Sequence, residues 1–187
     1  MNIVYGGAFN PPTIAHLNII RKLTDLFQDA KVIILPVGDQ YQKDDLVLFH
    51  HRYEMLKKMT SSMKNVIIST LEQEHGFIGT VHSLKILSKT YAHIHFVIGS
   101  DHLNQLKTWI DYQTLLKAYP LIVINRNHYM KIEQAEQLFK DIKHQFIFID
   151  FNMEISSTKV RNQIHKNKHL LDGKVYQYIQ KHQLYKD

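Results

Sequence analysis

The chain opens on the stretch Asn2-Ile3-Val4-Tyr5-Gly6-Gly7-Ala8-Phe9-Asn10-Pro11-Pro12-Thr13-Ile14-Ala15-His16, and the expected architecture can be built outward from it. The apolar run at residues 3–5 predicts a buried strand. Gly6-Gly7 then lets the backbone turn sharply and lets a ligand approach without meeting a Cβ. Pro11-Pro12 ends any regular element, and Thr13 suits the N-cap of the helix that follows. The stretch therefore predicts a strand, a tight turn and a helix start.

His16 falls on the first turn of this expected helix. A helix N-terminus presents unpaired backbone N–H groups and a partial positive charge, so it is a natural site for phosphate. A histidine there can add a hydrogen bond to a phosphate oxygen. For an isolated histidine, a surface side chain in a strand-to-helix loop is the commoner explanation. The glycines and prolines before His16 stand where a nucleotide site needs them, which favours phosphate binding.

The composition is that of an ordinary globular protein. With 187 residues, 44% hydrophobic and 21% charged, the chain suits a single domain spanning residues 1–187. No apolar run approaches the length of a membrane helix, and no signal segment precedes the first strand. The absence of cysteine excludes a disulfide scaffold, a thiolate metal site and a cysteine nucleophile. We expect a cytoplasmic protein with no membrane partner.

The net charge of +6 favours anionic ligands but does not separate nucleic acid from nucleotide. Only four of the 23 cationic residues are arginine. Because arginine can hold a phosphate or carboxylate through two hydrogen bonds and lysine cannot, Arg52, Arg126 and Arg161 are candidate binding residues. We expect Arg21, within the first helix, to be a surface charge.

Apolar segments without polar alternation are separated by segments of helical periodicity, which predicts a doubly wound α/β fold with a parallel sheet covered on both faces. Strands are expected at residues 3–5, 31–37, 66–68, 94–98, 121–124 and 146–149. Helices are expected from residue 14 and at residues 48–59, 81–87, 103–107, 112–119, 132–143, 157–166 and 175–182, and a loop at 71–79. In such folds ligands bind at the carboxyl ends of the strands.

A second motif, Ile155-Ser156-Ser157-Thr158-Lys159-Val160-Arg161, begins the helix after the sixth expected strand. Its hydroxyl groups, backbone N–H groups and arginine can together bind a polyphosphate. A plain helix cap with solvated charges is the alternative, and for this motif alone it would be preferred.

The two motifs together resemble the T/H-x-G-H and I-S-S-T-x-[IV]-R signatures of the nucleotidylyltransferase superfamily, in the version found in bacterial nicotinate-nucleotide adenylyltransferases. The second signature matches completely. In the first, Ala15 replaces the usual glycine, Thr13 takes the position of a first histidine, and Asn10 stands where aspartate is common.

Weaker similarities to the same family extend over the chain. Lys43 followed by His51-Arg52-Tyr53-Glu54-Met55 is similar to a lysine loop and an H-R-x-x-M element, although prolines usually precede the lysine. Thr80-Val81-His82-Ser83-Leu84 resembles T-x-x-T-L, with Thr80 as the expected helix cap. Gly99-Ser100-Asp101 followed by Trp109 resembles G-x-D…W, and the tail that ends in Leu184-Tyr185 resembles the family's L-Y ending.

The resemblance implies an adenylyltransferase that joins ATP and nicotinate mononucleotide to give deamido-NAD and pyrophosphate, with Mg²⁺ arriving on ATP. The implied catalytic residues are His16, Lys43 and Arg161. The implied ATP-binding residues are Gly6, Gly7, Ala8, Phe9, Thr13, His16, Gly99, Asp101, Ile155, Ser156, Ser157, Thr158 and Arg161. The implied mononucleotide-binding residues are Asn10, Lys43, Arg52, Thr80, Val81, Trp109 and Arg126.

Other functions were weighed against this one. The chain lacks a G-x-G-x-x-G fingerprint, a G-K-[ST] loop and a G-x-S-x-G elbow. His93 and His95 would share a strand face, but no third histidine has zinc-like spacing, so no metal site is expected. No recognised nucleic-acid-binding module is present. The same chemistry on nicotinamide mononucleotide or phosphopantetheine, and a non-catalytic nucleotide-binding protein, stay as alternatives. A homo-oligomeric state also stays open.

Overall fold

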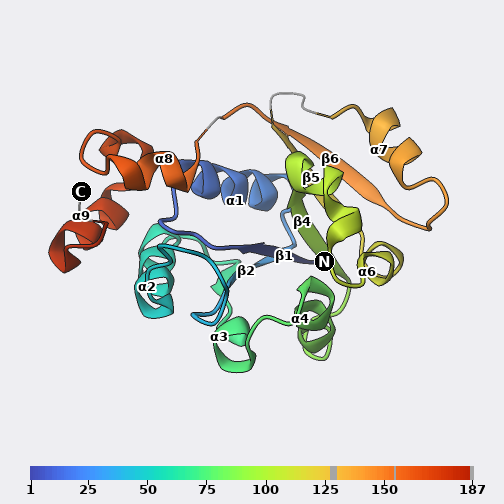
Figure 1. The fold of residues 1–187 in the computed structure, drawn as a ribbon, viewed down its shortest axis with the longest axis horizontal. Helices are drawn as coiled ribbons and strands as arrows, with labels where there is room; N and C mark the ends of the chain where they lie inside the picture. The colour runs from blue at the N-terminus through green and yellow to red at the C-terminus, as the bar shows by residue number, and fades with distance from the viewer. Residues whose placement is uncertain (127–129, 154, 186–187) are drawn as a thin grey trace.

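A computed structural model describes residues 1–126, 130–153 and 155–185. Within this part of the chain, six strands form one parallel sheet in the order β3-β2-β1-β4-β5-β6 (Figure 1). The strands are β1 (Asn2–Gly7), β2 (Lys31–Pro36), β3 (Val66–Ile68), β4 (Ile94–Gly99), β5 (Leu121–Arg126) and β6 (Phe146–Phe151). The doubly wound α/β fold expected from the sequence is confirmed.

The helices follow the strands in alternation. They are α1 (Ile14–Leu26), α2 (Phe49–Met59), α3 (Leu71–His75), α4 (Thr80–Leu87), α5 (Ser100–Asn104), α6 (Tyr112–Ala118), α7 (Ile132–Leu138), α8 (Ser157–Asn162) and α9 (Gly173–His182), with 3₁₀ turns η1 (Leu106–Thr108) and η2 (Lys168–Leu170). Helix α1 lies along one side of the sheet, and α3 and α4 lie along the other (Figure 1).

The sheet separates two apolar cores. On β1, Ile3 and Tyr5 belong to the core that includes residues of α1, α2 and α9, whereas Val4 belongs to the core that includes residues of α4 and α6. Successive side chains of a strand point to opposite faces, so a strand covered on both faces must be apolar throughout. This requirement explains the unbroken apolar runs in the sequence.

Several of the expected element boundaries were wrong, and the helix expected at residues 103–107 is divided between α5 and η1. Residues 71–79 are not all loop, because α3 forms there between Thr70 and Gly76, whose φ of 72° ends it. Helix α4 has Gly79, with φ of 114°, at its N-cap, and Thr80 is its first residue. Two helices are also shorter than expected: α7 ends where buried Phe139 leaves the helix, and α8 ends before Ile164 turns into the core.

The strand order reverses direction between β1 and β4. Connections from these two neighbours run to opposite sides of the sheet, and this leaves a crevice at their carboxyl ends. The glycine turn after β1 and the start of α5 after β4 therefore lie at the edge where a ligand is expected.

Candidate active site

A cavity of about 620 Å³ opens at this edge of the sheet, a volume suited to a small-molecule ligand. Segments far apart in the sequence line it, among them the end of β1, the lysine loop (residues 38–48), the start of α4, the end of β4 with η1, the end of β5 and the start of α8. The expected site residues on its wall are Gly6, Gly7, Ala8, Phe9, Asn10, His16, Lys43, Thr80, Gly99, Trp109, Arg126, Ile155, Ser156, Ser157, Thr158 and Arg161.

His16 is half-buried at the third position of α1 and faces the cavity. Its Nδ1 accepts a hydrogen bond from the backbone N–H of Thr13 at 2.9 Å. Burial, with a smaller contribution from the charge of Arg126, lowers the pKa of His16 to about 3. The imidazole is therefore neutral at physiological pH, and because Nδ1 is an acceptor, Nε2 must hold the proton. His16 can offer that single N–H to a ligand oxygen.

Thr13 does not lie on the cavity wall, contrary to the expectation that it binds ATP. Its side chain is fully buried, and its Oγ1 lies 2.9 Å from His16 Nδ1. The residue is the N-cap of α1, as predicted. Its backbone N–H and its hydroxyl both contact the histidine ring, and its carbonyl accepts from Leu17 N. Thr13 therefore orients His16 instead of contacting the ligand.

The glycine turn brings a second aromatic ring against His16. Phe9 has a φ of 47° and packs edge-on to His16, with 5.1 Å between ring centroids. A Cβ at Gly7 would lie 3.3 Å from the Phe9 ring. Glycine at this position therefore allows the Phe9 ring to pack over the strand end and against the imidazole.

The start of α8 brings hydroxyl groups and a guanidinium to the cavity. Ser156 caps the helix by accepting from Lys159 N, and the Ser157 hydroxyl donates to Pro11 O at 2.9 Å. The guanidinium of Arg161 donates to Asn10 O at 2.7 Å and to Thr158 Oγ1 at 3.4 Å. Two of its five N–H groups are thus used. The guanidinium is held in place at the cavity wall, and its other N–H groups remain for a ligand.

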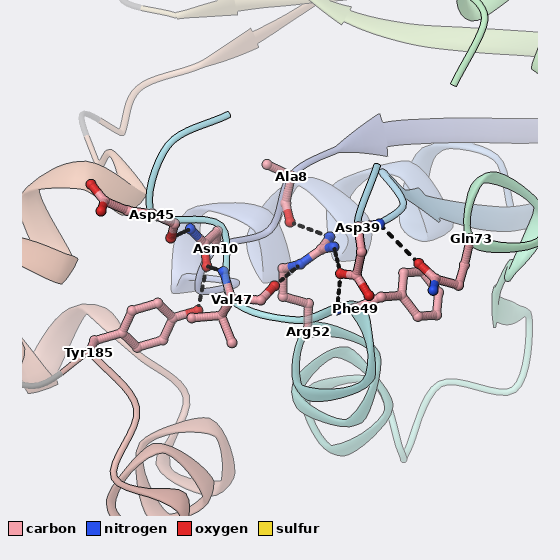
Figure 2. A network of polar contacts seen from close by, with 9 residues as sticks. All are labelled: Ala8, Asn10, Asp39, Asp45, Val47, Phe49, Arg52, Gln73 and Tyr185. Carbon is pink, nitrogen blue, oxygen red and sulfur yellow. Dashed lines mark hydrogen bonds and ion pairs between the residues drawn. The ribbon is translucent and has the colours of Figure 1, made fainter. Parts of the chain in front are cut away.

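Arg52 does not line the cavity, which corrects its expected role in mononucleotide binding. Figure 2 shows the contacts that it makes instead. The residue is fully buried. Its guanidinium donates to the carbonyls of Val47 and Ala8 and pairs with Asp39 Oδ1 at 3.4 Å. Burial lowers the pKa of Arg52 and the Asp39 carboxylate opposes this. Arg52 therefore ties the lysine loop to the end of β1.

Asn10 touches the cavity, but its amide is committed to the protein (Figure 2). Its Nδ2 donates to Asp45 O at 2.7 Å, and its Oδ1 accepts from Val47 N at 3.2 Å and from the Tyr185 hydroxyl at 2.7 Å. The side chain is 1% exposed, and these bonds use both lone pairs of its Oδ1 and one of its two N–H donors. This corrects the expected binding role and assigns Asn10 to the architecture of the loop.

The start of α4 forms the far wall. The N–H groups of His82 and Ser83 donate to Gly79 O, whereas the first N–H groups of a helix have no partner within it. Thr80 lines the cavity, but the Val81 side chain is buried in the core beneath α4. Of the two residues expected here, only Thr80 can present its side chain to a ligand in the cavity. Val81 can contact a ligand only through its backbone.

Gly99 lines the cavity at the end of β4, but Asp101 does not. The Asp101 carboxylate is exposed, and its Oδ2 lies 3.8 Å from His102 Nε2. His102 is the residue of this segment on the cavity wall. The G-x-D resemblance predicts Asp101 at the site, whereas the turn of α5 puts its neighbour His102 at the cavity.

Trp109 and Arg126 form the remaining part of the wall. The half-buried Trp109 ring packs edge-on to Phe96 and lies 6.2 Å from the His102 ring. Arg126, at the end of β5, has a buried Nε with no hydrogen-bond partner in the described structure. A buried donor left unpaired by the protein is available to a bound anion.

Sequence reasoning missed several wall residues. Glu72 is 3% exposed; its Oε1 accepts from the Ser83 hydroxyl at 2.8 Å, while its Oε2 is buried with no partner in the described structure. Burial raises the pKa of Glu72 to about 7, and the Ser83 hydrogen bond opposes this. The other wall residues not expected include Tyr41, Phe77, Thr108 and Ile110. They lie in segments interpreted as loops, where no periodicity could mark them.

Two negative findings concern the described residues only. No three histidine, aspartate or glutamate side chains come together there as a metal site would require. None of the helices in that part of the chain is long and apolar enough to cross a membrane.

Comparison with known proteins agrees with this geometry. Residues 4–163 match the cytidylyltransferase-like family model. A probable nicotinate-nucleotide adenylyltransferase of Acholeplasma laidlawii is 38% identical over 100% of this chain and 98% of its own length. Its counterpart in Clostridium acetobutylicum is 32% identical over 97% of each chain.

A solved structure of Plasmodium falciparum nicotinic acid mononucleotide adenylyltransferase complexed with NaAD has the same fold. It superposes with a TM-score of 0.82 at 23% identity, over 98% of this chain and 96% of that one. The chain thus belongs to the cytidylyltransferase-like family and, within it, to the nicotinate-nucleotide adenylyltransferases.

Proposed function

We propose that this protein transfers the adenylyl group of ATP to nicotinate mononucleotide, and that it releases pyrophosphate. The observation that supports this most directly is the fixed tautomer of His16. Its Nε2–H faces a cavity lined also by Lys43, Arg126 and Arg161. One neutral donor and three cations suit a reaction between two phosphate-bearing substrates.

The chemistry asks the protein for positioning and charge neutralisation. An oxygen of the mononucleotide phosphate attacks the α-phosphorus of ATP, forming one P–O bond while the bond to the β-phosphate breaks. The attacking phosphate is already ionised at neutral pH, so no general base is needed. His16, Lys43 and Arg161 would hold the phosphates in line and stabilise the charge that develops on the leaving pyrophosphate.

We assign the nicotinate carboxylate to the start of α4. The unpaired N–H groups of Thr80 and Val81 are aligned donors, and the dipole of α4 favours an anion there. Gly79 supports this assignment, since its φ of 114° turns the chain into the helix and a Cβ there would lie 3.3 Å from Ile110. An amide group would point its own N–H donors at these donors.

Purified protein should therefore prefer nicotinate mononucleotide over nicotinamide mononucleotide by about tenfold or more in kcat/KM. Pyrophosphate release with ATP and each mononucleotide measures this directly. Equal rates on both acceptors would contradict the assignment to α4 and leave the adenylyl transfer intact. No release with either acceptor would refute the proposed function.

Trp109 should stack on the pyridine ring of the acceptor. Its ring is half-buried and lines the cavity, and stacking of one ring on an aromatic side chain contributes about 1–3 kcal/mol. Trp109→Ala should raise KM for the mononucleotide about tenfold, and Trp109→Phe should retain most of the affinity.

The KM for ATP serves as the internal control for both Trp109 variants and should change little. If Trp109→Ala lowers thermal stability but leaves both KM values unchanged, Trp109 only packs against Phe96 and the hydrophobic core.

Other features of the reaction stay predictions. We propose that Mg²⁺ enters as part of the ATP substrate, which suits a site whose described residues provide no cluster of metal ligands. The cytoplasmic location, the absence of a nucleic-acid partner and a homo-oligomeric state are likewise predictions.

A further inference from the structure

We propose that Tyr185 is a positioning residue that holds Lys43 at the cavity through Asn10. This inference rests on the proposed function for its activity readout. Tyr185 lies beyond the residues 4–163 that match the family model. Its hydroxyl donates to Asn10 Oδ1 at 2.7 Å, across the whole length of the chain (Figure 2).

The lysine loop, residues 38–48, is anchored at both ends. At its start, Asp39 N donates to Gln73 Oε1 and the Asp39 carboxylate pairs with Arg52. At its end, the amide of Asn10 bonds Asp45 O and Val47 N. Lys43 lies between these anchors on the cavity wall and is exposed. Its position therefore depends on the anchors and not on contacts of its own.

Asn10 connects three parts of the site. Its side chain bonds the lysine loop, its carbonyl accepts from Arg161 Nη1, and its Oδ1 also accepts from the Tyr185 hydroxyl. If the amide rotated, Nδ2 and Oδ1 would exchange places and both loop contacts would be lost. Asp45 O can only accept and Val47 N can only donate, so these two contacts set the amide orientation, and the Tyr185 hydroxyl stabilises it by donating to Oδ1.

The two residues that contact the Asn10 side chain from either side, Asp45 and Tyr185, have an unusual backbone conformation. Tyr185 has a φ of 54° and Asp45 a φ of 59°, a left-handed conformation that is unfavourable for residues other than glycine. Burial raises the pKa of the Tyr185 hydroxyl, and the charges of Arg52 and Arg161 oppose this rise. The hydroxyl is thus protonated and donates.

Tyr185→Phe tests the inference because it removes only the hydroxyl group. We expect kcat/KM for adenylyl transfer to fall about fivefold, the usual effect of one lost hydrogen bond, with no large change in melting temperature. The matched control is Tyr176→Phe, on α9, whose hydroxyl bonds His165 and Gln180 outside the cavity. This control should behave as wild type.

A double-mutant cycle separates positioning of Lys43 from a general structural role. If Tyr185 acts through Lys43, then Tyr185→Phe should lower kcat/KM less than about twofold when Lys43 is already alanine. The same fivefold loss in both backgrounds would overturn the inference.

Limited digestion with trypsin supplies a readout that does not depend on the reaction. Cleavage after Lys43 should be several times faster in Tyr185→Phe than in wild type or in Tyr176→Phe, because the loop has lost an anchor. Unchanged cleavage would overturn the inference even if activity fell. Should the wild-type protein release no pyrophosphate with any mononucleotide, the proposed function fails, and the cleavage rates still decide whether Tyr185 holds the loop.

Discussion

His16→Ala lowers kcat by about 10²-fold or more, the effect expected when a fixed donor to a developing negative charge is lost. The donor is Nε2–H, because Nδ1 accepts from the backbone N–H of Thr13. Alanine removes this donor and leaves the helix intact. Steady-state pyrophosphate release at saturating ATP and mononucleotide measures the change.

Two companion variants sharpen this test. Glutamine can place an amide N–H near the position of Nε2, so His16→Gln should recover part of the rate. His169→Ala, an exposed histidine on η2, is the matched control and should keep the wild-type kcat. A near-normal kcat for His16→Ala would show that the imidazole does not act on the phosphates.

The pH dependence of kcat distinguishes a hydrogen-bond donor from a titrating acid or base. Burial and the Arg126 charge lower the pKa of His16 to about 3, so the neutral form persists at every pH above that value. Wild type and His16→Ala should therefore show kcat profiles of the same shape between roughly pH 5 and 9. A limb near neutrality that disappears in His16→Ala would contradict a permanently neutral His16.

Sequence reasoning found the sheet because its physical cause is local. Residues 121–124 are apolar on both faces, and only a strand covered by helices on each side can bury such a run. The rule that ligands bind at the carboxyl ends of parallel strands then predicted that the segments after these strands form one site. His16 and Arg161 were predicted to meet in this way, although 145 positions separate them, by 161 − 16.

The roles of polar residues inside the site were harder to predict because they depend on tertiary contacts. An arginine after a lysine loop can bind a phosphate or hold the loop, and the sequence is compatible with both. Arg52 is buried and donates to the carbonyls of Val47 and Ala8, which shows that it holds the loop. Thr13 is a similar case, because a threonine there can bind a ligand or orient the histidine. In the structure its backbone N–H donates to His16 Nδ1.

The Glu72 carboxyl escaped prediction for a different reason. Helix α3 contains five residues, too few to show a helical period in the sequence. Only the structure shows that Leu71 and Glu72 turn inward while Glu74 stays exposed. The same burial makes a measurable prediction about stability.

Glu72→Gln removes a pH-dependent loss of stability. The folded protein raises the pKa of Glu72 from its ordinary value of 4.5 to about 7, so folding favours the protonated form. The stability that goes with protonation is fully present below pH 4.5 and is lost as the pH rises through about 7. The difference between the two pKa values corresponds to about 3 kcal/mol, and roughly 2 kcal/mol of it falls between about pH 5 and 8.5.

Glutamine imitates the protonated carboxyl, because its Oε1 can still accept from the Ser83 hydroxyl and it does not ionise. The free energy of unfolding of Glu72→Gln, measured in urea, should therefore fall less than that of wild type over this pH range. By pH 8.5 the variant should have gained about 2 kcal/mol relative to wild type, compared with their difference at pH 5. Glu74→Gln is the matched control, since Glu74 lies on the same helix but is exposed and bonds Thr70. Its curve should run parallel to that of wild type. If the Glu72→Gln and wild-type curves were parallel instead, Glu72 would already be ionised in the folded protein at pH 5, and the buried Oε2 would need a partner that satisfies its charge.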